Sequence, residues 1–113
     1  MMTDWNAYRA HLGDSIKAFA ALSPDTIKGL QTLDGAAART GHLDAKTREL
    51  IALAVAVTTR CDGCISVHST AAVKAGATKA EIAEALGVAV ALNAGAATVY
   101  SSRVLDAVDT VTG

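Results

Sequence analysis

The chain has 113 residues, 51% of them hydrophobic, and its 10 basic and 11 acidic residues leave a formal net charge of −1. This length fits a single domain, residues 1–113, that can bury a core. The near-neutral charge argues against the basic surface that binds nucleic acid or anionic membranes, so we expect neither partner. The sequence starts without the basic and apolar regions of a secretory signal, which predicts a cytoplasmic location.

The first part of the chain is predicted to form two helices. Apolar side chains spaced by three and four residues favour an amphipathic helix over residues 3–21. This stripe contains most of the aromatic residues and is formed by Trp5, Tyr8, Leu12, Ile16 and Phe19. Ser23 and Pro24 predict a second helix, because serine is a favoured N-cap and proline fits the first helical position. We expect this helix to run to about Arg39 and to end at Gly41.

Two further helices are expected in the middle of the chain. Asp44 is a suitable N-cap for a third helix, which we expect to end near residues 59–60. A fourth helix is predicted to begin at Cys61 and to end at residues 75–76, where glycine follows alanine. The cysteine therefore stands at the start of a helix.

The last helix is predicted to run from Lys79 to about Val108. Thr78 and Glu81 form a capping-box sequence at its start. Because this helix is long for so small a domain, we expect it to bend or break at one of its glycines. Small residues at four-residue steps leave room for another helix to approach closely: Gly87, Ala91 and Gly95.

The apolar segment 82–100 lies within this last helix. It contains Glu84 and Asn93 and is built of Ala, Gly and Val rather than Leu, Ile and Phe, so we expect a poor membrane span. Alanine is abundant throughout the chain and proline occurs once, which favours closely packed helices. We therefore predict an all-α fold of about five helices without a β-sheet.

Cys61 and Cys64 provide the clearest chemical signal. If a helix begins at this motif, Cys61 lies at its N-cap, Cys64 lies one turn in, and His68 lies on the same face as Cys64. The helix N-terminus and the imidazole both favour a thiolate. Residues three apart at a helix start can bring their Cβ atoms within bonding range, so we predict a reversible disulfide. The pair is a candidate dithiol/disulfide centre with its own base.

Other interpretations of the cysteine pair fit the sequence less well. Free cysteines are often buried and inert, although rarely at a helix start. Two thiolates and His68 provide three zinc ligands, but structural zinc needs four, and no second C-x-x-C or H-x-x-x-H occurs. Haem attachment needs a histidine where this chain has Ile65, and a thioredoxin-like site needs a βαβ pattern. We therefore expect no metal and no cofactor.

Glu49 is the candidate partner of His68. A carboxylate hydrogen-bonded to the imidazole would fix its tautomer and raise its basicity. The alternative is an exposed helix acid paired with Arg48 or Lys46, and the spacing alone supports both interpretations equally. The other two histidines have no comparable neighbours and are expected at the surface: His11 and His42.

Three segments of the sequence together resemble a known family: 43–54 (LDAKTRELIALA), 61–68 (CDGCISVH) and 75–82 (AGATKAEI). They are similar to the carboxymuconolactone decarboxylase superfamily, in particular to its alkylhydroperoxidase D-like (AhpD-like) branch. The likeness extends from Leu43 to about Leu86. The combined pattern Glu-x(11)-Cys-x-x-Cys-x-x-x-His is far more specific than C-x-x-C alone.

The resemblance implies a compact all-helical domain that assembles into a homo-oligomer, a trimer or hexamer. It also implies thiol-based reduction of hydroperoxides without haem, flavin or metal, and an external dithiol reductant such as a lipoyl group. Carried over to this chain, it makes Cys64 the peroxide-attacking thiol and Cys61 the resolving thiol. Glu49 and His68 become the proton relay. The expected protein is an alkylhydroperoxidase-like thiol oxidoreductase.

Two features depart from the characterised peroxidase of that branch. That peroxidase carries a histidine directly before its second cysteine, where this chain has Gly63, and it is longer than this chain. The lactone decarboxylases of the superfamily lack the cysteine pair, which points away from decarboxylation. Two alternatives stay open. One is a non-enzymatic oligomeric redox sensor or binding scaffold of the same fold, and the other makes Cys61, nearer the helix terminus, the attacking thiol.

Overall fold

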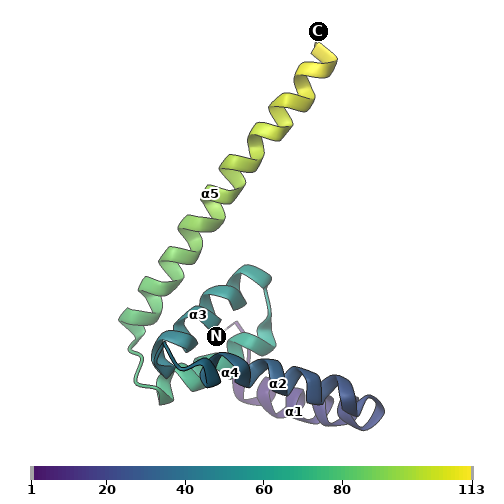
Figure 1. The fold of residues 1–113 in the computed structure, drawn as a ribbon, viewed down its shortest axis with the longest axis vertical. Coiled ribbons are helices and arrows are strands. Elements are labelled where there is room, and N and C mark those ends of the chain that lie inside the picture. The colour runs from purple at the N-terminus through teal and green to yellow at the C-terminus, as the bar shows by residue number, and fades with distance from the viewer. Residues whose placement is uncertain (1, 113) are drawn as a thin grey trace.

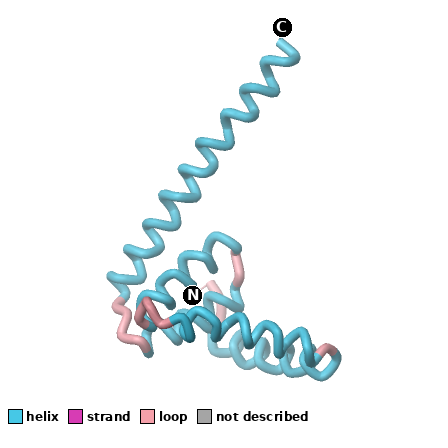
Figure 2. The backbone as a smooth tube through the Cα atoms, in the orientation of Figure 1, coloured by secondary structure: helices cyan, strands magenta, loops and turns pink. Residues whose placement is uncertain are grey.

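The computed structural model describes residues 2–112, which form five helices and no strand. Figure 1 and Figure 2 show four shorter helices at one end of the molecule and one long helix that leads away from them. The predicted all-α class and the five helices in their order are confirmed. The helices have these bounds: α1 Trp5–Leu22, α2 Pro24–Thr40, α3 Ala45–Thr59, α4 Asp62–Lys74 and α5 Lys79–Thr112.

α1 and α2 pack side by side and are joined through Ser23. The Asp4 side chain accepts a hydrogen bond from the Ala7 N–H at 3.1 Å and caps α1, which begins slightly later than predicted. Pro24 occupies the start of α2, as predicted. The Ser23 hydroxyl, however, bonds the Thr26 hydroxyl at 2.7 Å and caps no backbone N–H. The proline thus contributes more to this helix start than the serine does.

α2 and α3 each end at a residue with left-handed backbone conformation. Gly41 has a φ of 79° and ends α2 at the predicted place. Arg60 has a φ of 54° and ends α3. Among residues 2–112 it is the one residue other than glycine with a positive φ. Because a side chain disfavours this conformation, the short turn between α3 and α4 carries local strain.

The core lies between α3, α4 and the start of α5. Leu53, Ala72 and Ala77 are buried there, and larger apolar side chains pack against them: Leu50, Ile82 and Leu86. Ala72 is fully buried, and its small side chain allows α4 to approach α3 closely. This contact fixes the relative position of the two helices that carry the predicted site residues.

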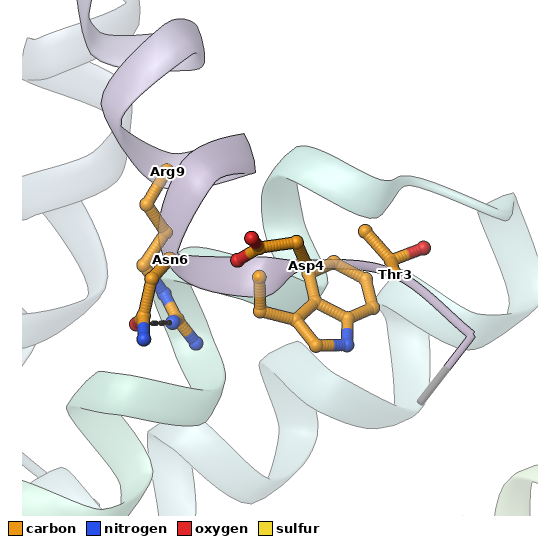
Figure 3. Close-up of a pocket in the computed structure, with 5 residues that line it drawn as sticks. Thr3, Asp4, Asn6 and Arg9 are labelled. Atoms are coloured by element: carbon orange, nitrogen blue, oxygen red, sulfur yellow. Dashed lines mark hydrogen bonds between the residues drawn. The ribbon is translucent and has the colours of Figure 1, made fainter.

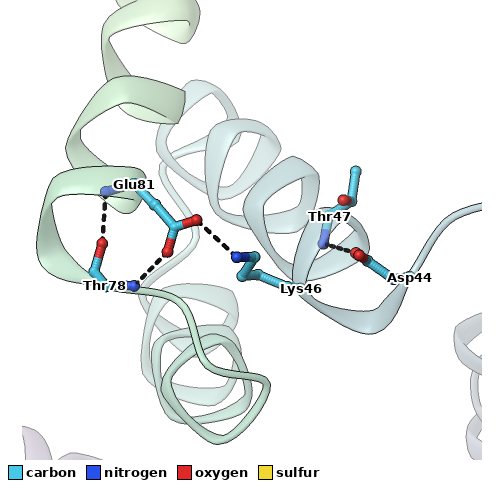
Figure 4. A network of polar contacts seen from close by, with 5 residues as sticks. All are labelled: Asp44, Lys46, Thr47, Thr78 and Glu81. Atoms are coloured by element: carbon cyan, nitrogen blue, oxygen red, sulfur yellow. Dashed lines mark hydrogen bonds and ion pairs between the residues drawn. The ribbon is translucent and has the colours of Figure 1, made fainter.

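A polar network joins the first turn of α3 to the first turn of α5 (Figure 4). The Thr78 N–H donates to Glu81 Oε1 at 3.0 Å and the Glu81 N–H donates to Thr78 Oγ1 at 3.1 Å, which confirms the predicted capping box. Glu81 also forms an ion pair with Lys46 at 2.7 Å. Asp44 caps α3 by accepting from the Thr47 N–H at 2.8 Å, as predicted. The hydrogen bond from Lys46 lowers the pKa of Glu81.

α5 is one continuous helix of 34 residues, from Lys79 to Thr112, and Figure 1 shows it as straight. The prediction that it bends or breaks at a glycine is wrong. Glycine keeps its backbone N–H and weakens a helix by only about 1 kcal/mol relative to alanine. Since α5 contains no proline, its hydrogen bonds continue past Gly87 and Gly95.

Only the first part of α5 packs against α3. Asn93 lies near the end of this contact, where its side-chain amide donates to the Thr58 hydroxyl at 3.0 Å. All residues from 94 to 112 are exposed. The molecule is therefore elongated, with extents of 57 × 38 × 36 Å and a radius of gyration of 18.5 Å, against about 13 Å for a tightly packed chain of this length.

The hydropathy of α5 differs from the sequence-based expectation. An 18-residue window of this helix has a mean hydropathy of 1.6, and 6% of the window is buried. By length and composition alone the helix is apolar enough to cross a membrane, whereas the segment 82–100 was predicted to be a poor span. The many Ala and Val residues offset the scarcity of Leu, Ile and Phe. Core helices of soluble proteins meet the same criterion, because protein can cover apolar side chains as lipid does.

Candidate functional site

Cys61 and Cys64 lie at the start of α4 and are joined by a disulfide. Cys61 is the N-cap residue, with extended backbone, and its Sγ accepts a hydrogen bond from the Cys64 N–H at 3.1 Å. The two Cα atoms are 5.2 Å apart, within the usual range for a disulfide. Both side chains are half-buried. The predicted bond between them is therefore present, and its reversibility stays a prediction.

Glu49 and His68 meet between α3 and α4. His68 Nδ1 lies 2.7 Å from Glu49 Oε2, and the two side chains are 34% and 23% exposed. A carboxylate beside Nδ1 favours the imidazole tautomer that is protonated at Nδ1. In this tautomer Nε2 is the hydrogen-bond acceptor. His68 is four residues after Cys64 on α4, so both side chains project from one face of that helix.

The alternative partners of Glu49 are engaged elsewhere. Lys46 pairs with Glu81, and the Arg48 guanidinium donates to the Leu43 carbonyl oxygen. The interpretation of Glu49 as an exposed acid paired with either cation is therefore wrong. Its carboxylate is directed towards α4, because α3 presents residue 49 on the side that packs against α4.

Helix α1 covers the start of α4. Arg9 Nε donates to the Ser66 carbonyl oxygen at 3.0 Å and ties the two helices together. A Cβ atom added to Gly63 would lie only 3.3 Å from Leu12 Cδ2 and 3.9 Å from the Tyr8 hydroxyl oxygen. Glycine at position 63 thus permits the close approach of α1 to the disulfide. Sequence reasoning missed this role, since it requires residues more than 50 positions apart to meet.

Two of the clefts that border α1 have volumes above 500 Å³. One, of about 530 Å³, lies between α1 and α4 and is mainly apolar, with two cations at its edge; its lining includes Leu12, Ile16, Val67, Thr70, Arg9 and Lys17. The other, of about 560 Å³, is formed by the first residues of the chain and by Arg9, which donates to Asn6 Oδ1 at 3.4 Å (Figure 3). The apolar cleft shares Leu12 with the surroundings of Gly63, and its α4 lining is Ser66, Val67 and Thr70.

The described residues offer no metal site of the ordinary kind. No group of three His, Cys, Asp or Glu side chains within residues 2–112 is placed to hold a metal ion. The two remaining histidines are exposed: His11 and His42. The polar groups that the structure brings together are thus a disulfide and a carboxylate–imidazole pair, which suit thiol chemistry with proton transfer.

Comparison with known proteins places this arrangement in a family. The sequence model of the carboxymuconolactone decarboxylase family matches residues 24–107. The chain belongs to this family. The resemblance drawn from the sequence is confirmed at that level, and the AhpD-like branch is part of the same superfamily.

Relatives of this carboxymuconolactone decarboxylase family protein share most of its length. A crystal structure of an apo family member from Legionella pneumophila has a TM-score of 0.73 and 36% identity, and the match covers 90% of this chain and 91% of that one. An uncharacterized protein of Haemophilus influenzae is 55% identical over 107 residues, 95% of each chain. "Uncharacterized protein 4 in cox locus" of Paracoccus denitrificans is 42% identical over 73 residues, 65% of this chain and 66% of its own.

Proposed function

We propose that this family member is an AhpD-like thiol oxidoreductase that reduces hydroperoxides, or disulfides, through Cys61 and Cys64. The observation that carries the proposal is the 2.7 Å hydrogen bond between Glu49 of α3 and His68, which follows Cys64 by one helical turn on α4. A decarboxylase would have no evident use for two bonded cysteines. A thiol enzyme needs both a disulfide partner and a base.

The proposed reaction begins with the reduced pair. His68 accepts the Cys64 proton at Nε2, while Glu49 stabilises the resulting imidazolium through Nδ1–H. The Cys64 thiolate attacks one oxygen of the hydroperoxide, the O–O bond breaks, and the alkoxide takes the proton from His68 and leaves as an alcohol. Cys64 is then a sulfenic acid.

The second half of the reaction regenerates the dithiol. The Cys61 thiolate attacks the Cys64 sulfur, and the sulfenic oxygen leaves with a proton as water, which gives the disulfide. An external dithiol such as a lipoyl group then reduces this disulfide by two thiol–disulfide exchanges and is itself oxidised.

Multiple turnover distinguishes an enzyme from a sensor. Purified protein is mixed with excess cumene hydroperoxide and dihydrolipoamide, and peroxide loss is followed. We expect many equivalents of peroxide to be consumed per chain, and none beyond background for Cys64→Ser. Consumption of a single equivalent, with dihydrolipoamide unable to restore the thiols, would instead support the non-enzymatic redox sensor or scaffold.

We also propose that a second copy of the chain covers the free part of α5. The chain exposes 8510 Å², whereas a compact protein of 11.5 kDa exposes about 5,800 Å². The excess of about 2,700 Å² far exceeds the ~800 Å² that each partner contributes to a standard interface. A homo-oligomer, a trimer or hexamer by the family resemblance, hides this surface.

The face of α5 that packs on α3 continues beyond α3. Ala89 and Asn93 lie on this face, and the helical repeat carries it on to Tyr100, Val104 and Val111. These three are 67%, 62% and 82% exposed. The opposite side carries polar residues: Glu84, Thr98, Ser102, Asp106 and Asp109. Charged and hydroxyl side chains on that side fit a helix with a protein partner on one side and water on the other, rather than lipid all round. A cytoplasmic location stays a prediction.

A further inference from the structure

The hydroxyl group of Tyr8 lies at the start of α4, beside the cysteine pair. The Cβ position of Gly63 is 3.9 Å from the Tyr8 hydroxyl oxygen and 4.0 Å from Cys61 Sγ. The two atoms thus flank one small volume that a side chain at position 63 would fill. The phenol therefore borders the same space as the Cys61 sulfur.

The surrounding contacts hold Tyr8 in this place. Its ring packs edge-to-face against Trp5, with centroids 5.7 Å apart and planes at 69°. On the next turn, Leu12 meets Gly63, and Arg9 is bonded to the Ser66 carbonyl of α4. α1 is therefore fixed against α4 without the help of the Tyr8 hydroxyl, which is free to act as a donor.

The Cys61 sulfur has an incomplete set of donors. As the N-cap, it accepts the Cys64 N–H at 3.1 Å, and the helix dipole favours negative charge there. A thiolate accepts more than one hydrogen bond, and a hydrogen bond to the charged form lowers a thiol pKa. His68 is in phase with Cys64, so it serves the other thiol.

We propose that the Tyr8 hydroxyl donates a hydrogen bond to the Cys61 thiolate when the disulfide is open. The inference rests on the proposed thiol chemistry and names a further residue in it. In the forward step, the Cys61 thiolate attacks the Cys64 sulfenic acid, the S–O bond breaks, and the oxygen leaves as water with a proton. In the reductive step, a reductant thiolate attacks Cys64 Sγ and the electron pair of the S–S bond passes to Cys61 Sγ. Tyr8 stabilises the thiolate in both steps.

The test measures each thiol separately. The ultraviolet absorbance of the thiolate is titrated against pH in Cys64→Ser, which leaves Cys61, with and without Tyr8→Phe. We expect Tyr8→Phe to raise the midpoint of Cys61 by about one pH unit, the effect of one charge-assisted hydrogen bond. The same substitution in Cys61→Ser should leave the midpoint of Cys64 unchanged. Leu12→Ala loosens the packing of α1 but keeps the phenol. It should leave the titration midpoint of Cys61 unchanged.

An unchanged pH midpoint for Cys61 in Tyr8→Phe would overturn the proposal. Equal shifts at both thiols, or a shift with Leu12→Ala of the same size, would also overturn it, because they would indicate a general loosening of α1. In the otherwise unchanged chain, Tyr8→Phe should prolong the lifetime of the Cys64 sulfenic acid roughly 3-fold, because the smaller thiolate fraction is partly offset by the higher nucleophilicity of the less acidic thiol. The titrations need no peroxide turnover, so they can fail or succeed independently of the proposed peroxidase activity.

Discussion

Glu49 illustrates how a single hydrogen bond changes the meaning of a surface-like residue. From the sequence it was as suited to an ion pair with Lys46 or Arg48 as to a proton relay. In the fold its carboxylate lies 2.7 Å from His68 Nδ1, while both cations bind other groups. The carboxylate therefore controls the tautomer of an imidazole that faces the same way as Cys64.

The first prediction concerns this pair. Glu49→Gln should slow the reaction of the reduced protein with hydroperoxide roughly 10-fold near neutral pH, and His68→Ala roughly 100-fold, the lower range for loss of a general base. Thiol loss followed by alkylation and mass spectrometry measures both rates. Both variants should still form the disulfide with diamide, since a strong oxidant does not need the relay.

Glu84→Gln is the matched control for Glu49→Gln. It also removes one carboxylate, but from an exposed position on α5. Its reaction rate should equal that of the unchanged protein. If Glu84→Gln were as slow as Glu49→Gln, net charge rather than the relay would account for the loss.

The second prediction separates the two cysteines. His68 favours Cys64 as the attacking thiol, so Cys61→Ser should react once with peroxide and accumulate a sulfenic acid that dimedone labels. Cys64→Ser should not. The N-cap position of Cys61, whose sulfur accepts the Cys64 N–H, is the physical basis for the reverse assignment. Dimedone labelling of Cys61 in Cys64→Ser, with none of Cys64 in Cys61→Ser, would establish that reverse order.

At the scale of the helices, the Lys46–Glu81 ion pair links the starts of α3 and α5. The hydrogen bond from Lys46 holds the pKa of Glu81 below its ordinary value of 4.5. A lowered folded-state pKa means that the stabilisation is complete above about pH 4.5 and is lost as the pH falls through the folded-state value. Acid should therefore weaken the attachment of α5 to α3.

The third prediction follows from the lowered pKa of Glu81 in the folded state. The melting temperature should fall as the pH is lowered below about 4.5, and this fall should be shallower in Glu81→Gln. Glu84→Gln, three residues along the same helix and without an ion pair, should keep the full slope. Thermal unfolding followed by circular dichroism between pH 3 and 7 measures the difference. Identical slopes for the two variants would show that the ion pair contributes nothing to the acid response.

The helices were predictable because their signals are local. Asp44, Pro24, Gly41 and the Thr78–Glu81 box act within one turn of the chain, and each stands where the sequence indicates. The prediction of a bend in α5 was wrong because glycine alone does not interrupt helical hydrogen bonds. The covering of Gly63 by Leu12 and Tyr8 could not be predicted, since no local pattern specifies which helix packs across another.

At the scale of the whole molecule, α5 determines the shape. Its first part completes the core, and its remainder extends from the domain (Figure 1). Apolar side chains on this remainder are exposed. An isolated helical stretch of this length gains little stability from its own hydrogen bonds in water. A neighbouring copy provides the missing contacts in the arrangement proposed above.

The fourth prediction tests this arrangement. The protein should sediment as a homo-oligomer without detergent, and Val104→Glu should shift it towards smaller species, because it places a charge in the proposed interface. Ser102→Glu adds the same charge on the opposite side of α5 and should keep the assembly intact. A monomer at micromolar concentration would contradict the proposal, as would partition of the unchanged protein into phosphatidylcholine vesicles.

The site residues also differ in how far apart they lie along the chain. The Glu49–His68 bond joins positions 19 apart on the α3–α4 pair, whereas the Arg9–Ser66 bond that attaches α1 joins positions 57 apart. Short loops cost less entropy to close than long ones, and chains form their local contacts sooner. The relay should thus assemble while α1 is still detached. A refolding chain would then pass through a stage in which the dithiol is already activated but still uncovered, and oxidation at that stage would precede completion of the fold.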